Sequence, residues 1–258
     1  MSAAGLKAVY LDLDGTLLGS GASLLRDGDG AFTLLGARAL EACARAGAEV
    51  VLYSGRRRSL LEEDGRVLGV RDYVFEVGSG LMLDGEVEWL TGDLEPRDGR
   101  SVRDRIVASG APGLLLEAFP GLRLDRDQDD REVTVVFRGE IDTAAADALL
   151  AERGHGGLRL LHNGPAKHLL PRGISKGRGV ARHMRARGLA PEEVIAVGDS
   201  REDLGVAEAV GVFWLVANGL AHDHTLREEQ ARLPNVRVTE AGHGPGVYEA
   251  VLTTLAGG

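Results

Sequence analysis

The chain has 258 residues, of which 44% are hydrophobic and 27% are charged, proportions that are typical of a folded globular protein and exclude a disordered or fibrous one. Its 39 acidic residues outnumber its 30 basic ones, and the formal net charge of -9 excludes a general positive field for nucleic acid or an anionic membrane. Because Cys43 is the single cysteine and no apolar run or leader pattern is long enough for a membrane span or a signal peptide, we expect a cytoplasmic protein.

Short apolar runs alternate with helical patterns in the first part of the chain. We expect strands at residues 7–13, 49–53 and 73–77 and helices at residues 33–46 and 56–68. Strand, helix and strand in succession form parallel βαβ units. The pattern therefore predicts an α/β fold with a doubly wound, Rossmann-like parallel sheet.

The pattern changes after residue 78. Residues 81–90 contain two apolar runs around Asp84 and Gly85, a dipeptide that favours a two-residue hairpin. The next segments are expected to be helix, strand, strand, helix, strand and strand, at residues 102–108, 122–125, 132–137, 143–152, 158–162 and 167–170. This order predicts an α+β domain.

After Pro171 the alternation of strand and helix returns. Helices are expected at residues 176–187, 202–210 and 247–255, and strands at residues 194–197 and 212–216. We therefore expect a discontinuous α/β core over residues 1–90 and 171–258 and an inserted α+β cap over residues 91–170. A cleft between two such domains is a common site for a small ligand.

Acidic side chains follow two of the expected strands. Asp12 and Asp14 come at the end of the first strand, and Asp199 and Asp203 follow the strand at residues 194–197. Each pair alone also fits an ordinary turn or helix cap. Ligands bind at the carboxyl ends of strands in open α/β sheets, and four converging carboxylates repel one another unless a hard divalent cation binds. The constellation predicts a Mg²⁺ site.

Anion-binding groups follow another strand and begin a helix. Ser54 and Gly55 come after residues 49–53, where backbone N–H groups at a helix start suit a phosphate, although a simple N-cap is the alternative. Lys176 begins a helix, where the dipole disfavours a cation. We interpret Lys176 as a phosphate ligand, with an exposed lysine as the alternative, and we expect Arg56 near the cleft.

These residues stand in four motifs. DLDGT, a strand followed by Ser and Gly, SKG and GDSREDL resemble, in this order, the motifs of the haloacid dehalogenase superfamily of phosphatases. The insertion point resembles that of members with a C2-type cap. EVTVVF and KHLLPRGISKG are similar to the branch that holds sucrose-phosphate phosphatase and mannosyl-3-phosphoglycerate phosphatase.

The resemblance implies roles for the motif residues. Asp12 would be the nucleophile that forms an aspartyl phosphate, and Asp14 the general acid and base. For this role, burial or neighbouring carboxylates must raise the pKa of Asp14. Ser54, Gly55 and Lys176 would bind the phosphoryl group.

The resemblance also implies the metal ligands. Asp12, Asp199 and the backbone carbonyl of Asp14 would hold Mg²⁺, and Asp203 would complete the site directly or through water. Glu202 stands where members of the family often have Asn, and it adds negative charge near the site.

On the cap, Arg138, Lys167 and His168 are candidates, with Arg56, for contacts to the leaving group. Strand register decides which of them face the cleft, because a slip of one residue reverses every side chain.

The expected protein is a phosphatase, a monomer or homodimer, that hydrolyses a small phosphorylated substrate under a mobile cap. The resemblance implies a phosphorylated sugar or a sugar phosphoglycerate as the substrate. The alternatives are a sugar phosphomutase of the phosphomannomutase kind, which a sugar bisphosphate would activate, and a non-catalytic phosphosugar-binding protein.

Overall fold

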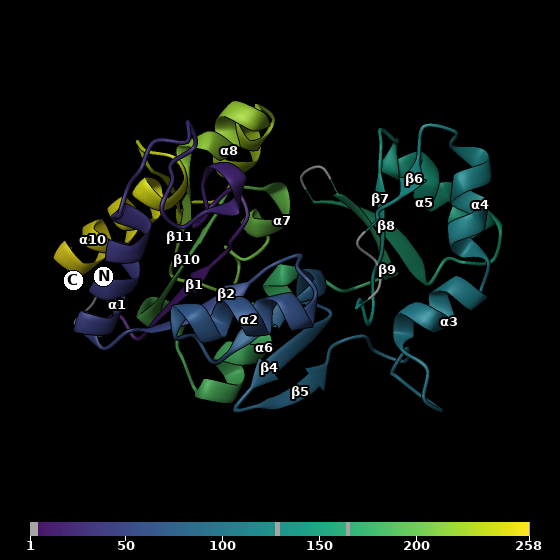
Figure 1. Cartoon of the computed structure of the whole chain (residues 1–258), viewed down its shortest axis with the longest axis horizontal. Helices are drawn as coiled ribbons and strands as arrows, with labels where there is room; N and C mark the ends of the chain where they lie inside the picture. The colour runs from purple at the N-terminus through teal and green to yellow at the C-terminus, as the bar shows by residue number, and fades with distance from the viewer. Residues whose placement is uncertain (1–4, 127–129, 164–165, 258) are drawn as a thin grey trace.

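Two β-sheets organise the chain, and each belongs to a separate lobe in Figure 1. The structure is a computed structural model that describes residues 5–126, 130–163 and 166–257. Within these ranges, no helix is long and apolar enough to cross a membrane.

The larger sheet has, among the described residues, eight strands in the order β12-β11-β10-β1-β2-β3-β4-β5. The strands from β12 to β3 pair in parallel, and β4 and β5 continue the sheet as an antiparallel hairpin. The strands are β1 (Ala8–Leu11), β2 (Glu49–Tyr53), β3 (Tyr73–Phe75), β4 (Gly80–Leu83), β5 (Glu86–Trp89), β10 (Val194–Gly198), β11 (Val212–Leu215) and β12 (Val236–Val238). This sheet confirms the predicted α/β class.

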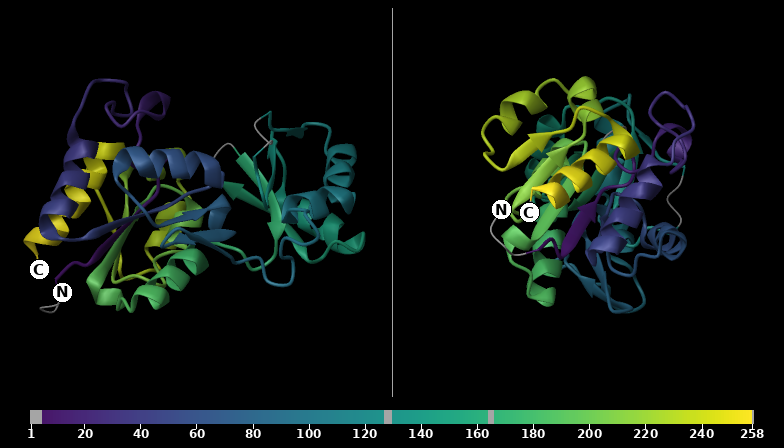
Figure 2. Two further views of the ribbon diagram at one scale, coloured as in Figure 1. Left: turned by 60° about the horizontal axis from the view of Figure 1, so that its bottom comes forward. Right: turned by 90° about the vertical axis from the view of Figure 1, so that its left-hand side faces the viewer.

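Helices cover both faces of this sheet, because its central strands are apolar along their whole length and must be buried on two sides. Figure 2 shows these helices from two further directions. One face packs against α1 (Leu35–Ala46), α2 (Arg58–Leu68) and α10 (His243–Ala256). The other packs against α6 (Lys176–Arg187), α7 (Arg201–Leu204), α8 (Ala217–His222) and α9 (Leu226–Gln230). Short 3-10 helices are η1 (Ser20–Ala22), η2 (Glu76–Gly78) and η3 (Pro191–Glu193).

The second sheet forms the cap and is antiparallel, in the order β6-β7-β9-β8. Its strands are β6 (Arg123–Leu124), β7 (Val135–Arg138), β8 (Leu158–Asn163) and β9 (Ala166–Pro171). One face packs against α3 (Val102–Ala108), α4 (Ala111–Ala118) and α5 (Thr143–Glu152) in an apolar core of its own. The inserted α+β cap is confirmed.

Several elements differ from the expected ones. Helix α4 was not expected, and it begins after Gly110 in the left-handed conformation with Pro112 in its first turn. The helix expected at residues 202–210 ends at Leu204, since the next amides bond to the third residue before them: Val206 N donates to Asp203 O at 2.8 Å. The strand expected to reach Val77 ends at Phe75, and the last helix begins at His243.

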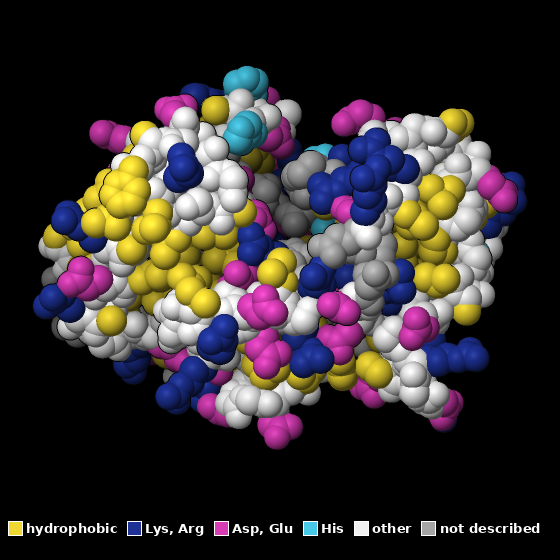
Figure 3. All heavy atoms as spheres, viewed as in Figure 1, with side chains coloured by type: hydrophobic (Ala, Val, Ile, Leu, Met, Phe, Trp, Pro, Cys, Tyr) yellow, Lys and Arg dark blue, Asp and Glu magenta, His cyan; other side chains and the backbone are white. Residues whose placement is uncertain are grey.

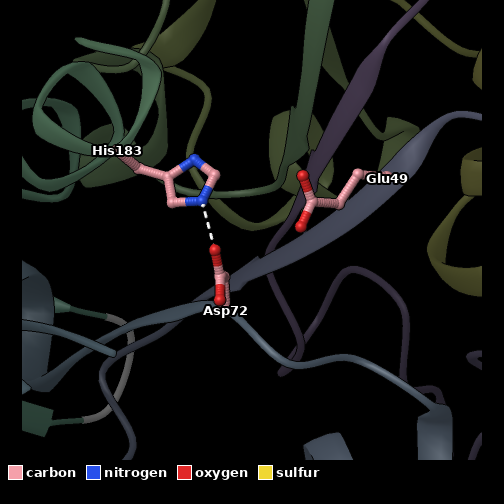
Figure 4. A group of neighbouring side chains, drawn as sticks. All are labelled: Glu49, Asp72 and His183. Carbon is pink, nitrogen blue, oxygen red and sulfur yellow. Dashed lines mark hydrogen bonds and ion pairs between the residues drawn. The ribbon is translucent and has the colours of Figure 1, made fainter. Parts of the chain in front are cut away.

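A buried polar network lies at the amino end of β3 (Figure 4). His183 on α6 places Nε2 2.9 Å from Asp72 Oδ2 and Nδ1 2.8 Å from the Tyr10 hydroxyl. Arg187 also donates to Asp72, through Nε at 3.1 Å, and the amide of Asp84 donates to its other oxygen. Glu49 lies beside this group. Because both oxygens of Asp72 already accept hydrogen bonds, we interpret the group as a structural link between the sheet and α6.

The network sets a stability prediction. Burial alone would raise the pKa of Asp72, but the hydrogen bonds from His183 and Arg187 outweigh it and lower this pKa below its usual value. A lowered folded-state pKa contributes stability above the unfolded-state value of about 3.9 and loses it as the pH falls through the folded-state value. We expect Asp72→Asn to lower the free energy of unfolding at pH 7 by about 3 kcal/mol and to weaken its dependence on pH below about pH 4.

Urea denaturation measures this change. Asp84→Asn is the matched control, because Asp84 pairs with the same Arg187 through a side chain that is 69% exposed. Its cost should stay below about 1 kcal/mol. Equal costs for the two variants would contradict the structural role of the buried network.

Candidate active site

Three carboxylates meet at the carboxyl edge of the large sheet. β1 pairs in parallel with β10, and the amide of Asp12 donates to Val197 O at 3.1 Å just beyond the paired residues. Asp199 follows β10, and Asp203 lies on α7. Carboxylate oxygens of Asp12, Asp199 and Asp203 lie within 4.8 Å of one another. The structure thus brings three of the four predicted acids together.

Lys176 lies among these acids as the first residue of α6. Its Nζ is 2.8 Å from Asp12 Oδ1 and 2.7 Å from Asp203 Oδ1, and its side chain is 2% exposed. The ammonium also lies over the ring of Tyr53, 5.4 Å from its centroid. Tyr53 was not predicted, although its place at the end of β2 is the signal that could have found it.

Negative charge exceeds positive charge in this buried group. Burial, with Asp203 and Asp199 close by, raises the pKa of Asp12 well above its usual value despite the opposing effect of Lys176. Burial and Asp203 raise the pKa of Asp199 to about 7. Burial would lower the pKa of Lys176, but Asp12 and Asp203 hold it above its usual range. An all-oxygen set with a surplus of negative charge fits a hard divalent cation.

Both carboxylate oxygens of Asp203 already accept hydrogen bonds from the protein. Its Oδ2 accepts hydrogen bonds from the amides of Asp199 and Ser200, at 3.2 and 2.9 Å, and from the Ser200 hydroxyl at 2.6 Å. Its Oδ1 accepts from Lys176. These contacts fix Lys176 and the turn after β10, so ligation by Asp203 through water fits them better than direct ligation.

Gly15 allows the turn after β1 to lie close to Asp199. Its φ is +84°, and a Cβ atom there would lie 2.5 Å from Asp199 Oδ2. The next residue, Thr16, donates from Oγ1 to Asp199 Oδ1 at 3.2 Å. Asn218, which was not predicted, donates from Nδ2 to the carbonyl of Gly15 at 2.8 Å and holds this turn from a third segment.

Asp14 lies apart from the other acids, which corrects one expectation. Its side chain is 55% exposed rather than buried, and it accepts a two-pronged bond from Arg56, whose Nε and Nη2 lie 2.7 and 2.5 Å from its oxygens. Arg56 also donates to Asp64 at 2.7 Å. The structure therefore does not bury Asp14 among other carboxylates, as its expected role required. Its backbone carbonyl as a metal ligand stays a prediction.

Ser54 and Gly55 follow β2 at the same edge of the sheet. Ser54 is buried, and its Oγ accepts a hydrogen bond from the amide of Arg56 at 3.2 Å. The carbonyl of Gly55 accepts from Nη1 of Arg131, a cap residue, at 3.1 Å. The predicted phosphate loop therefore touches the cap directly.

The cap strands separate Lys167 from His168. In the register of β7 and β9, His168 is opposite Val136 and Lys167 is opposite Phe137, so the two side chains leave opposite faces. Burial, followed by Arg131 and Lys176, lowers the pKa of His168 well below its usual value. Its buried Nδ1 has no hydrogen-bond partner among the described residues.

Glu202 lies half-buried beside the acids, as its position before Asp203 suggested. Burial raises its pKa, while Arg159 of the cap and Lys176 oppose this change. The extra negative charge at this position therefore lies close enough to interact with a cap arginine and with the site lysine.

A carboxylate of the core holds the backbone of the cap. Glu76 is fully buried, and its Oε1 accepts from the amide of Glu132 at 2.7 Å. Its Oε2 accepts from the amide and the hydroxyl of Thr134, at 2.7 and 2.8 Å, and more weakly from the amide of Val133 at 3.3 Å. The expected mobile cap is therefore tied to the core at residues 132–134.

This contact depends on an uncommon backbone conformation. Glu76 and Val77 have φ values of +44° and +62°, which non-glycine residues rarely adopt. This left-handed conformation turns the Glu76 carboxylate toward the cap and places Val77 in the apolar core of the cap. No periodicity in the sequence signals such a step, so these residues were not predicted.

Comparisons with known proteins relate the chain to phosphatases. It is 30% identical over 249 residues to a phosphoglycolate phosphatase of Methanoculleus marisnigri, with 95% of each chain covered. It is also 30% identical over 216 residues to a phosphoglycolate phosphatase of Halorubrum lacusprofundi, which covers 81% of this chain and 83% of that one. No family model matches the chain.

Solved structures share the fold. The sucrose-phosphatase of Synechocystis sp., in complex with sucrose and phosphate, superposes with a TM-score of 0.71 at 17% identity and covers 97% of this chain and 98% of that one. A haloacid dehalogenase-like hydrolase of Bacteroides thetaiotaomicron has a TM-score of 0.67 at 18% identity, covering 96% and 99%.

The Glu76 contact sets a prediction for the cap. Glu76→Gln keeps the shape but replaces an acceptor oxygen by an NH₂ group that faces backbone N–H donors. We expect the free energy of unfolding to fall by about 1 to 3 kcal/mol and the amides of residues 132–134 to exchange hydrogen faster.

Hydrogen exchange read by mass spectrometry measures this effect. Glu132→Gln is the control, because Glu132 forms a partly exposed pair with Arg58 whose loss should cost less than about 1 kcal/mol. Unchanged exchange at residues 132–134 in Glu76→Gln would contradict the role of Glu76 as the tether of the cap.

Proposed function

The chain belongs to the haloacid dehalogenase superfamily of phosphatases and is a phosphoric monoester hydrolase, and we propose that it acts on a small phosphate monoester through an aspartyl phosphate on Asp12. One observation carries the proposal. Asp12 is buried against Lys176 with Asp199 and Asp203 beside it, at the sheet edge where such folds bind ligands.

The nucleophile is held in one orientation. Lys176 binds Oδ1 of Asp12, which leaves Oδ2 to attack the phosphorus atom. A carboxylate and a phosphate charge about 4 Å apart repel each other by about 4 kcal/mol at an effective dielectric constant near 20, so attack requires neutralisation. Lys176 supplies part of it, and Mg²⁺ bound by Asp12, Asp199 and the Asp14 carbonyl, with Asp203 in support, would supply the rest.

The proton steps fall to Asp14. As Oδ2 of Asp12 bonds to phosphorus, the ester P–O bond breaks and the leaving oxygen takes a proton from Asp14. Asp14 then takes a proton from water, the water oxygen bonds to phosphorus, and the Asp12–phosphorus bond breaks to release inorganic phosphate.

Arg56 controls this acid in our proposal. Arg56 occupies both oxygens of Asp14, so an oxygen has to separate from Arg56 before Asp14 can exchange a proton with the leaving group or with water. A bound phosphate competes for the same guanidinium, which suits Arg56 as a substrate ligand beside Ser54, Gly55 and Lys176.

Two leaving groups are supported. The relatives that share 30% identity carry the name phosphoglycolate phosphatase, so phosphoglycolate is the first substrate to test. The sequence motifs favour a phosphorylated sugar or a sugar phosphoglycerate, which are the second class. The proposal also includes a cap that extends over residues 91–170, a monomeric or homodimeric state, and a cytoplasmic location.

Phosphate release tests the reaction. We expect release from phosphoglycolate or from one member of a panel of sugar phosphates and sugar phosphoglycerates, with Mg²⁺ and not with EDTA. Asp12→Asn should lower turnover by at least about 1,000-fold, because it removes the nucleophile. Asp223→Asn, at a surface pair with Arg201, is the matched control and should keep full activity.

Other outcomes discriminate the alternatives. Substantial turnover by Asp12→Asn would remove Asp12 as the nucleophile. If no substrate releases phosphate and a sugar bisphosphate activates transfer between sugars, the mutase alternative replaces the hydrolase.

A further inference from the structure

The charges of the cap leave the binding of a cation to the core. A cavity in the cap has a volume of about 660 Å³, and its lining has four basic residues and two acidic ones: Arg123, Arg126, Arg138, Lys167, Asp125 and Glu140. Figure 3 shows Lys and Arg side chains gathered on the cap along the hollow between the lobes. A lining with this surplus of positive charge repels a divalent cation. The loops of the core that carry Asp12 and Asp199 therefore set the affinity for Mg²⁺.

The turn after β1 has one backbone carbonyl without a hydrogen bond. The carbonyls of Asp12 and Leu13 accept from amides later in the same loop, at 2.9 to 3.3 Å. The carbonyl of Gly15 accepts from Nδ2 of Asn218 at 2.8 Å. Within the part of the chain that the structure describes, no group donates to the carbonyl of Asp14. An unpaired carbonyl oxygen beside carboxylates suits a hard cation, which supports the expected ligand role of this carbonyl.

Asn218 connects this turn to the start of α10. Its Oδ1 accepts from the amide of His243, the first residue of α10, at 2.9 Å, while its Nδ2 donates to the carbonyl of Gly15. The side chain must therefore accept on one side and donate on the other. Of the side chains with this shape, only an amide does both, since an aspartate accepts on both sides and a leucine does neither. The two contacts thus assign the orientation of the amide group.

Two glycines allow close packing around Asn218. Gly219 lies so near Asp199 that a Cβ atom would be 2.3 Å from the carbonyl oxygen of Asp199. A Cβ atom at Gly242 would be 2.8 Å from Oδ1 of Asn218 itself. The loops after β11 and β12 therefore pack tightly beside the metal-binding turns and leave the Asn218 side chain little freedom to move.

We propose that Asn218 is a positioning residue that sets the affinity of the core for Mg²⁺. Its hydrogen bond holds the carbonyl of Gly15, which keeps the turn after β1 against Asp199. The same bond leaves the Asp14 carbonyl as the unpaired one. The inference rests on the proposed function, in which Mg²⁺ binds at this turn, and it assigns a role to a residue outside the four motifs.

Calorimetric titration with Mg²⁺, in the absence of substrate, tests this role. Asn218→Leu has nearly the same shape and adds no charge, but it removes both hydrogen bonds. We expect it to raise the dissociation constant for Mg²⁺ by about 5- to 50-fold. Gly242→Ala displaces the Asn218 side chain without removing it, so the constant should rise less, by about 2- to 5-fold. Should Asn218→Leu fail to fold, Gly242→Ala decides the question.

Asn235→Leu is the matched control for loss of structure. Asn235 is half-buried like Asn218, and its Nδ2 donates to the carbonyls of Ala207 and Val210 at 2.8 and 2.9 Å. It precedes β12, at the edge of the sheet opposite to the acids. This variant should lower the Tm but leave the dissociation constant for Mg²⁺ within about 2-fold of the wild type. If Asn218→Leu also lowers the Tm and still binds Mg²⁺ as tightly as the wild type, Asn218 is a structural residue only and the proposal is wrong.

Turnover gives a second readout. Because Asn218 acts through the cation, saturating Mg²⁺ should restore kcat of Asn218→Leu to within about 3-fold of the wild type, with an unchanged KM for the substrate. A kcat that stays low at saturating Mg²⁺ would overturn the proposal.

The two measurements separate this inference from the proposed function. If the wild type binds Mg²⁺, Asn218→Leu weakens this binding and no phosphate monoester is hydrolysed, the role of Asn218 stands and the proposed function is wrong. If phosphate monoesters are hydrolysed with Mg²⁺ but Asn218→Leu keeps the affinity of the wild type, the proposed function stands and the role of Asn218 is wrong. A wild type that does not bind Mg²⁺ overturns both.

Discussion

The ammonium of Lys176, buried between Asp12 and Asp203, is the interaction on which the site depends. Asp12 and Lys176 are 164 positions apart in the sequence, and the first part of the core and the inserted cap lie between them. Each of these charges would be strongly unfavourable in the interior without the others. The site therefore exists only when both halves of the core have assembled. Three carboxylates around one ammonium leave a surplus of negative charge, which explains why the site suits a divalent cation.

The same assembly fixes the cap through η2. The amide of Val77 donates to Ser54 O at 3.0 Å, and that of Glu76 donates to Arg56 O at 2.9 Å. Gly78 packs so closely against the carbonyl of Ser175, next to Lys176, that a Cβ atom would lie 2.0 Å from it. One short element thus connects the loop after β2, the start of α6 and the cap, so the cap is linked directly to both segments that we propose to bind phosphate.

Sequence reasoning located the residues whose position follows from strand order. Asp12, Ser54 and Asp199 were predicted at one edge because parallel strands end together, and Lys176 because a cation at a helix start needs a reason. The sequence did not predict contacts that depend on side-chain direction. The turn of Asp14 toward Arg56 and the left-handed step at Glu76 leave no periodic signal, and β12 was missed because its three residues include the polar Arg237.

The two lobes carry opposite surpluses of charge. The core gathers three carboxylates around one ammonium, whereas the cap cavity gathers four cations around two acids. A phosphate monoester is anionic, so it requires a cation to approach the acids of the core but none to approach the lining of the cap cavity. The difference confines the need for a divalent cation to the core, because the acids that repel a phosphate gather around Asp12 and not on the cap.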